Sequence, residues 1–375
     1  MSLAVGSVFL YSTDMRSPKS SDQRHAGRGT QTAPAHRFSR QVSAPVDDGW
    51  GRELDELPAL KTELRPEIAR TIVNKVNSPD IPIKQSINPY RGCEHGCVYC
   101  FARPSHSYLD LSPGLDFETR LSYKANAAEL LEKRFRTPGY EVKPIALGIN
   151  TDAYQPVERK LQLTRRLLKV MLEYRHPVSL LTKGVLMLRD LDLLEQLAEQ
   201  NLVSVSISIT TMNQDLKRRM EPRTASPRAR LNMLSRLRDI GISPGVMVAP
   251  IIPAINDDEL ETILARSAGA GAAHASYVAL RLPHELNDLF RDWLKEHFPD
   301  RAQHVMSLVR QLHGGKDYDA RFGLRQTGQG PFAQLLAQRF KVAARRHGLN
   351  RVSGQALDCD AFRVPERDGD QFSLI

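Results

Sequence analysis

Three of the four cysteines in this 375-residue chain lie in one short stretch, residues 88–101. Cys93, Cys97 and Cys100 have the spacing C-x3-C-x2-C. Thiolates are soft, anionic ligands, so a group this compact predicts a metal or cluster site. A closed structural site uses four protein ligands, whereas a reactive site leaves one position open for water, substrate or cofactor. Three cysteines therefore favour a reactive site with one open position.

A zinc site is the alternative for this loop. His95 lies between the first two cysteines and could complete a Cys3His ligand set. The fourth cysteine, Cys359, follows Asp358 in a polar stretch and is expected to be an unrelated free thiol. Four cysteines in this arrangement do not form a disulfide scaffold, so a reducing cytoplasm is the predicted compartment.

The loop must be positioned by the elements around it, and these follow a regular pattern over residues 85–297. Short apolar strands alternate with amphipathic helices, which predicts an α/β fold with a parallel sheet wrapped by helices. Roughly six such units are present, where a full barrel typically needs about 250 residues, so a partial (β/α)6 TIM-type barrel is expected. The predicted strands are Gln85–Tyr90, Pro144–Asn150, Pro177–Thr182, Val203–Thr210, Gly245–Ile252 and Ser276–Arg281. The predicted helices are Ala125–Phe135, Leu161–Tyr174, Leu188–Gln200, Pro227–Ile240, Asp257–Ala268 and Asn287–His297.

Outside this core the chain divides into three further parts. Residues 1–50 are rich in Ser, Gly, Pro, Gln and Arg and are predicted to be a disordered basic tail. Residues 51–84 form an N-terminal extension with a predicted helix at Pro66–Val76. Residues 298–375 form a basic, mainly helical C-terminal extension, with a helix expected at Pro331–His347.

Composition excludes a membrane-spanning protein and leaves the basic charge to be explained. No apolar run approaches the length of a membrane span. Residues 3–11 are apolar, but no Lys or Arg precedes them, so no secretory signal is predicted, and Met15 is an alternative start. Net charge is +9, and nine Lys/Arg against two Asp lie within 301–350. That segment is either a phosphate-contacting face or an ordinary solvated surface.

Polar residues follow the predicted strands where the chemistry of such folds is found. The carboxyl ends of parallel strands meet on one face, and that face carries the active site in barrels of this kind. The second strand ends in Asn150-Thr151-Asp152, and the third in Thr182-Lys183. The fourth carries Ser206 and Ser208, which alternation places on one face of the strand, and is followed by Glu221-Pro222-Arg223. Taken singly, each of these is an ordinary surface or interior residue.

Together with the cysteine loop, these residues resemble the radical S-adenosylmethionine (radical SAM) superfamily. Its defining C-x3-C-x2-C follows the first strand of a partial barrel, with an aromatic residue, here Tyr99, before the third cysteine. Asn-Pro-Tyr-Arg-Gly-Cys at 88–93 and Tyr-Cys-Phe-Ala-Arg at 99–103 resemble the spore photoproduct lyase-related branch, described as DNA repair photolyase-like. The runs at 151–156 and 221–223 and Thr182-Lys183 are similar to that branch as well.

The resemblance implies an enzyme with two cofactors, a [4Fe–4S] cluster and S-adenosylmethionine (SAM). The reduced cluster cleaves SAM to methionine and a 5′-deoxyadenosyl radical, which abstracts hydrogen from a substrate. An electron donor such as flavodoxin or ferredoxin is implied as a partner. The implied cluster ligands are Cys93, Cys97 and Cys100. The implied SAM-binding residues are Tyr99, Asn150, Thr151, Asp152, Lys183, Ser206, Ser208 and Arg223, with Val246 and Val248 as walls for the adenine.

One position departs from the branch. In spore photoproduct lyase a cysteine just before the second-strand Ser/Thr donates hydrogen to the product radical, whereas Ile149 stands at the aligned position here. No cysteine lies between Cys100 and Cys359. The resemblance therefore implies the radical chemistry but not thymine-dimer reversal. A nucleic acid lesion is one candidate substrate, and a peptide or small metabolite is another. The non-enzymatic alternative is a nucleic-acid-binding protein with a structural metal site.

Overall fold

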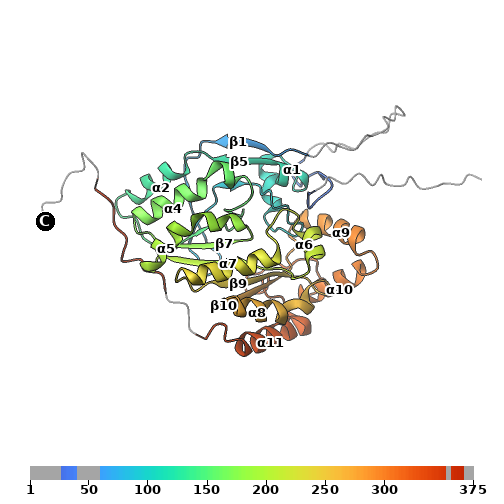
Figure 1. Ribbon diagram of the computed structural model, residues 1–375. Coiled ribbons are helices and arrows are strands. Elements are labelled where there is room, and N and C mark those ends of the chain that lie inside the picture. The colour runs from blue at the N-terminus through green and yellow to red at the C-terminus, as the bar shows by residue number, and fades with distance from the viewer. Residues whose placement is uncertain (1–26, 40–59, 352–355, 367–375) are drawn as a thin grey trace, which may run out of the picture.

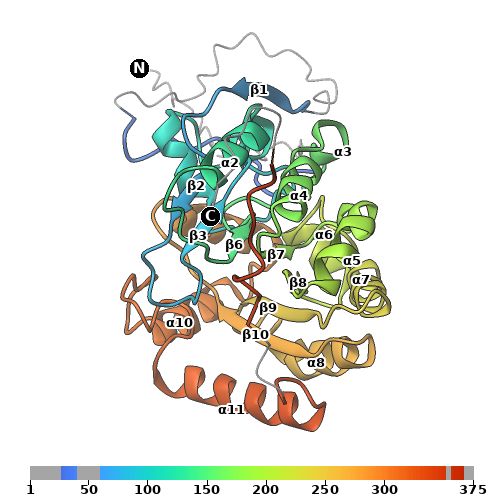
Figure 2. The ribbon, with the colours of Figure 1, turned by 90° about the vertical axis from the view of Figure 1, so that its left-hand side faces the viewer.

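A seven-stranded sheet organises the chain. The computed structural model describes residues 27–39, 60–351 and 356–366 (Figure 1). The strand order is β10-β9-β8-β7-β6-β3-β2, and all neighbours are parallel except β2 and β3. The bounds are β2 Val73–Lys75, β3 Gln85–Ile87, β6 Ile145–Leu147, β7 Val178–Thr182, β8 Val203–Ser208, β9 Gly245–Ile251 and β10 His274–Ala279. The six predicted strands are thus confirmed, and Figure 2 shows them following one another across the sheet.

Helices cover one face of this sheet, as expected for a partial (β/α)6 barrel (Figure 1). Leu167, Leu180, Ile207, Leu234 and Ile263 come from alternating strands and helices and are buried in one apolar core. The residues of each strand that face the helices are apolar, and the layer of helices buries these residues. The helices are α1 Leu115–Thr119, α2 Ala127–Phe135, α3 Glu158–Leu161, α4 Leu163–Glu173, α5 Leu191–Glu199, α6 Gln214–Met220, α7 Pro227–Asp239, α8 Leu260–Gly269, α9 Leu286–His297, α10 Ala302–Leu312 and α11 Gly330–Arg346. Short 3-10 helices span Arg103–Leu109, Val185–Asp190 and Asp257–Glu259.

The helix predicted at Pro66–Val76 is wrong. The chain there forms β1 (Glu63–Glu67) and β2, and β1 pairs in parallel with β5 (Arg120–Lys124). With β4 (Tyr90–Arg91) these strands make a second, three-stranded sheet of order β1-β5-β4. Proline cannot donate to a ladder, and Pro66 is tolerated because β1 lies at the edge of that sheet.

Part of the predicted disordered tail packs against the barrel. Residues 1–26 and 40–50 lie outside the described residues, but Arg28, Thr30 and His36 are buried. Glu118, fully buried, accepts hydrogen bonds from the backbone nitrogens of Gly29 (2.9 Å) and Thr30 (3.0 Å). The expectation of a loosely attached tail therefore does not hold for residues 27–39, which a buried carboxylate ties to the core.

The C-terminal extension, helical as expected, covers the β10 edge of the sheet. Helix α11 packs against α8 (Figure 2). Beyond it, the side-chain amide of Asn350 donates to the Ala275 carbonyl (3.0 Å) and accepts from the Ala275 nitrogen (2.9 Å). In the segment between α10 and α11, the Gln326 carbonyl accepts from the nitrogen of Ala279 (2.7 Å). Exposed backbone groups of this edge strand are thus paired by residues from the extension.

The same segment reaches across to the other edge of the sheet. The guanidinium of Arg325 pairs with the carboxylate of Asp80, in the turn between β2 and β3, and donates to the hydroxyl of Ser78 (2.7 Å). The backbone nitrogen of Gly323 donates to the same carboxylate (2.6 Å). A side-chain contact therefore bridges the two edges that a six-stranded partial barrel leaves apart.

Candidate active site

The cysteine loop lies at the carboxyl end of β3 and is tightly folded. Cys93 and Cys97 are buried and Cys100 is half-buried. Gly92 and Gly96 have φ angles of +79° and +67°, a region that favours glycine. A Cβ atom on Gly96 would stand 2.6 Å from a carboxylate oxygen of Glu118, so only glycine fits there. The sequence around the cysteines thus fixes a compact backbone that faces their thiols inward.

These thiols are built to be ligands rather than free nucleophiles. Burial raises the pKa of Cys97 to about 12, and it raises the pKa of Cys93 well above its usual value. Bound iron would favour the thiolate form of these cysteines. Within the described ranges no three His, Cys, Asp or Glu side chains lie close enough to share one metal ion. An iron–sulfur cluster would take one thiolate on each of three iron atoms, and Cys93, Cys97 and Cys100 are the residues that would hold it.

His95 is engaged with Asp152 instead of completing a zinc site. Its Nδ1 lies 3.3 Å from one oxygen of the Asp152 carboxylate. The other oxygen accepts from the Thr182 hydroxyl (2.6 Å), and the Lys183 nitrogen donates to the first (2.8 Å). Burial alone would raise the pKa of Asp152, but His95 and these hydrogen bonds hold it below its usual range. Asp152 therefore joins the ends of β6 and β7 to the cysteine loop.

The three residues predicted after β6 have different surroundings. The Thr151 hydroxyl is buried and donates to the Tyr90 carbonyl (3.0 Å), and both oxygens of Asp152 are occupied. The half-buried side-chain amide of Asn150 has no hydrogen-bond partner among the described residues. Of the three, Asn150 is the residue left available to a ligand.

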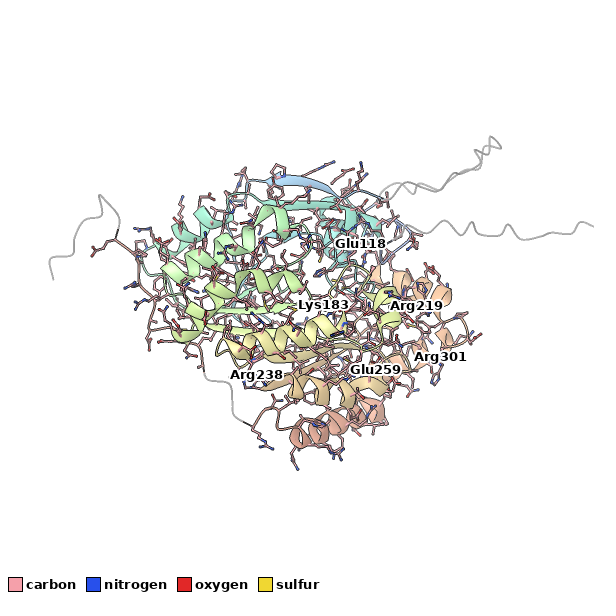
Figure 3. All side chains as sticks on the ribbon, in the orientation of Figure 1. Glu118, Lys183, Arg219, Arg238, Glu259 and Arg301 are labelled. Atoms are coloured by element: carbon pink, nitrogen blue, oxygen red, sulfur yellow. The ribbon has the colours of Figure 1, made fainter. Side chains whose placement is uncertain are left out.

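Lys183, at the end of β7, forms no direct ion pair with a described residue, although its charge acts on the buried carboxylate of Glu221. Its Nζ lies 5.8 Å from the centre of the Tyr99 ring and forms no ion pair or hydrogen bond with a described residue. Figure 3 shows Lys183 near the middle of the molecule. The ammonium is half-buried and lies close enough to Cys97 to stabilise its thiolate. An anionic group placed beside the cysteine loop would meet this charge.

Glu221 is a site residue that the sequence did not single out. It is fully buried, accepts from the Tyr99 hydroxyl and from Thr210 (2.7 Å), and pairs with the buried guanidinium of Arg230. Burial alone would raise the pKa of Glu221, but Arg230 and Lys183 lower it to about 2. In the sequence, the only signal for Glu221 was its place in the Glu-Pro-Arg run. Its partner Arg230 lies on the buried side of α7, and nothing in the sequence pattern connects the two residues.

The serines of β8 face the barrel interior as predicted. Val203, Val205 and Ile207 pack in the main core, so the alternating Ser206 and Ser208 point the other way. Ser208 is buried and donates to the Ala249 carbonyl (3.3 Å). Ser206 is half-buried, and its hydroxyl has no hydrogen-bond partner among the described residues. Ser206 is therefore the serine available to a ligand.

Val246 and Val248, predicted to form a wall for the adenine, face the helices and not the barrel interior. Ile207 is the register partner of Val246, and both valines belong to the core between sheet and helices. Ser208 is the partner of Met247, which therefore faces the interior. A parallel sheet buries both faces with apolar residues, so hydrophobicity alone did not distinguish the two sides.

Arg223, predicted with Lys183 as a cation for the carboxylate of SAM, lies beside the cysteine loop, where its backbone nitrogen donates to the His95 carbonyl (3.3 Å). Arg223 is exposed, and its Nη2 lies 3.3 Å from the carboxylate of Glu94. It lines a cavity of about 620 Å³ together with His95 and Lys160, beneath Thr62 of the N-terminal extension. Lys183 lies against Tyr99. A strand-end position does not by itself decide which way a long side chain points.

The comparison with known proteins shows which family this chain belongs to. A family model described as the radical SAM superfamily matches residues 87–266. An uncharacterized protein of Mycobacterium tuberculosis, Rv2578c, is 35% identical over 291 residues, which cover 73% of this chain and 86% of that protein. The chain belongs to the radical SAM superfamily. A second relative, from Methanocaldococcus jannaschii, is 31% identical and covers 49% of this chain and 67% of its own length.

The radical SAM fold is also seen in solved structures. A spore photoproduct lyase complexed with dinucleoside spore photoproduct has a TM-score of 0.56 and 15% identity, covering 76% of this chain and 80% of that chain. At this identity the likeness concerns the fold, and it confirms the predicted resemblance at that level. The chain is a radical SAM enzyme by family and architecture. No helix among the described residues is long and apolar enough to cross a membrane.

Proposed function

We propose that this radical SAM enzyme holds a [4Fe–4S] cluster on Cys93, Cys97 and Cys100 and binds SAM at the neighbouring strand ends. The observation that carries the proposal is a set of polar groups without partners. Asn150 and Lys183 follow the carboxyl ends of β6 and β7, and Ser206 lies within the adjacent strand β8; none of their side chains has a hydrogen-bond partner among the described residues. Buried or half-buried polar groups are rarely left unsatisfied, so they predict a ligand with matching groups.

The chain's residues divide the binding task among them. When bound, the cluster and SAM supply the reductive cleavage that yields a 5′-deoxyadenosyl radical. Lys183 provides the cation for the carboxylate of SAM, and Asn150 provides an acceptor for its amino group. Ser206 faces the interior where a ribose hydroxyl can bond to it. Tyr99, whose hydroxyl is held by Glu221, offers a fixed aromatic edge beside the cysteine loop.

Anaerobic reconstitution tests this assignment. The expected result is roughly four iron atoms per chain and methionine release from SAM under a strong reductant. A preparation that holds a single zinc ion and never cleaves SAM would contradict the proposal and favour the structural-metal alternative.

The charge favours nucleic acid as the substrate class. Of the nine Lys/Arg in 301–350, the four that pair with carboxylates are Arg310, Arg321, Arg325 and Arg339. The five with no ion pair to a described residue are Arg301, Lys316, Lys341, Arg345 and Arg346. These five remain able to contact phosphates. Incubation with deuterated candidate substrates tests the class, since the true one passes its label to 5′-deoxyadenosine. Label from a peptide or metabolite alone would reject the nucleic-acid proposal.

The reaction also needs one electron from outside, and we propose an acidic carrier such as flavodoxin or ferredoxin. Three exposed cations, Lys61, Arg159 and Lys160, line the cavity beside Glu94 and His95 of the cysteine loop, and none has an ion pair with a described residue. The double variant Arg159→Glu/Lys160→Glu should slow SAM cleavage driven by flavodoxin and leave cleavage driven by dithionite unchanged. If flavodoxin drove SAM cleavage at equal rates in the variant and the wild type, the cavity would not be the docking face.

A further inference from the structure

Arg281 is a half-buried charge without a partner beside the cysteine loop. Its guanidinium carbon lies 4.4 Å from the ring centre of Phe101, the residue after Cys100. No ion pair or hydrogen bond joins it to any residue that the structure describes. Burial lowers the pKa of Arg281 from its usual value, and the nearby charge of Arg325 lowers it further, against the opposing effects of Tyr318 and Asp80. Arginine stays charged at neutral pH, so its free N–H groups can take an oxyanion.

The backbone holds Arg281 firmly in this place. Leu280 and Leu282 on either side are buried in a cluster that includes Cys97 and Tyr99. The Leu280 nitrogen donates to the Ile251 carbonyl (3.0 Å), and its carbonyl lies 2.9 Å from Nε2 of His313. Extended alternation then directs Arg281 away from the leucines and onto Phe101. The side chain is therefore displayed by a rigid strand end.

A neighbouring arginine shows what a satisfied version of this arrangement looks like. Arg325 also lies 4.4 Å from a phenylalanine ring, that of Phe322. Unlike Arg281, it is paired with Asp80 and bonded to Ser78. Asp80 is in direct contact with Arg325 but acts on Arg281 only through its charge, so among the described residues no side chain bonds to the N–H groups of Arg281.

We propose that Arg281, stacked on Phe101, is the subsite for an oxyanion of the substrate, a phosphate or a carboxylate. The inference rests on the proposed function, since it assigns the anion to the substrate and not to SAM. Stacking on Phe101 fixes the plane of the guanidinium and leaves its N–H edges free for a bidentate contact.

Position separates this subsite from the SAM site. Lys183 follows β7 and lies on Tyr99, whereas Arg281 follows β10, the last parallel strand at the sheet edge. Phe101 is 41% exposed, so the subsite opens to solvent beside the cluster loop. A substrate that enters at this edge would place its anion on Arg281 and its remaining atoms toward the cysteine loop.

Arginine modification tests the subsite without knowledge of the substrate. The anaerobically reconstituted protein is treated with phenylglyoxal in phosphate, acetate or chloride at equal ionic strength, with and without SAM, and adducts are located by mass spectrometry. We expect phosphate or acetate to slow modification of Arg281 roughly tenfold and to leave the exposed Arg238 unchanged. Protection by phosphate alone identifies a phosphate-bearing substrate, and protection by acetate alone identifies a carboxylate.

Three results would overturn the inference. Equal protection by chloride means general screening, and protection by SAM alone means that Arg281 serves the cofactor. Absence of any reaction at Arg281 means that the side chain is closed to ligands. If SAM cleavage fails while phosphate still protects Arg281, the proposed function falls and the anion site stands.

A matched pair of variants separates binding from folding. Arg281→Gln should keep the thermal unfolding midpoint, as should the control variant Arg238→Gln at the far end of α7. The broadening of the phosphorus resonance of inorganic phosphate by the reduced cluster should be lost in Arg281→Gln only. Equal broadening in both variants would contradict the assignment.

Discussion

The Tyr99 hydroxyl donates to the buried carboxylate of Glu221, which links the cysteine loop to the chain beyond β8. Glu221 is in turn paired with Arg230, itself 1% exposed on α7. The aromatic residue beside the cysteines is therefore oriented by a buried ion pair. Such a pair is costly to break because either charge left alone is desolvated.

Replacing Glu221 with Gln should destabilise the apoprotein by roughly 3–5 kcal/mol at neutral pH, because Arg230 would lose its counter-charge. Tyr99→Phe removes one hydrogen bond and should cost about 1 kcal/mol. The pKa of Glu221 falls from 4.5 to about 2 on folding, so this contribution is present above pH 4.5 and is lost as pH falls toward 2. Urea unfolding measures both, and equal stability of Glu221→Gln and wild type would refute the assignment.

Cys97→Ala should abolish cluster binding and SAM cleavage and leave the barrel folded. A catalytic cluster in a large domain does not have to supply the folding energy, since the main core lies between sheet and helices. Iron content and the circular-dichroism melting transition check the two parts. Cys359→Ala is the control and should retain iron, and loss of the transition in Cys97→Ala would contradict the prediction.

Lys183→Ala should weaken SAM binding roughly tenfold to a hundredfold, the effect of losing a charge-assisted hydrogen bond. Arg223→Ala should leave SAM affinity unchanged, because Arg223 is turned toward Glu94. Equilibrium dialysis of labelled SAM against the reconstituted proteins measures both. The reverse order of effects would show that Arg223, not Lys183, holds the carboxylate.

His176 should make the stability of the fold depend on pH. It is buried and stacked on Phe135 at 4.4 Å, and burial lowers its pKa from 6.5 to about 4. The unfolded chain takes up a proton near pH 6.5 that the folded chain refuses until about pH 4. Stability is therefore complete above pH 6.5 and declines toward pH 4, by up to roughly 3 kcal/mol. Unfolding of His176→Gln should show a smaller decline, whereas the exposed His304→Gln should match wild type.

Most of the barrel could be predicted because its signal is local. Each parallel strand is a short apolar run bounded by polar residues, so β7 and β8 needed no knowledge of their neighbours. The strand β1 was missed because it depends on β5, far along the chain, which pairs Pro66 with Tyr123. For the same reason the ordering of Gly29 and Thr30 by Glu118 has no local signal.

The sequence predicted which positions belong to the site, but not which groups their side chains contact. The polar strand ends pointed to Lys183, whose ammonium lies 5.8 Å from the centre of the Tyr99 ring in the cysteine loop. The sequence did not show that the carboxylate of Asp152 is engaged by His95 and Thr182, or that Arg223 pairs with Glu94 of the cysteine loop. Which polar groups are already satisfied is a property of packing, and only three-dimensional contacts reveal it.

The pairing of Asn350 and Gln326 with β10 has a consequence for solution behaviour. An uncovered edge strand is a template on which another chain can add its own strand, the first step of aggregation. Here the Asn350 side chain occupies both hydrogen-bonding groups of Ala275, and Gln326 occupies that of Ala279. The C-terminal extension therefore keeps neighbouring copies from joining their sheets, and a truncation that removes both Gln326 and Asn350 should yield a protein prone to self-association.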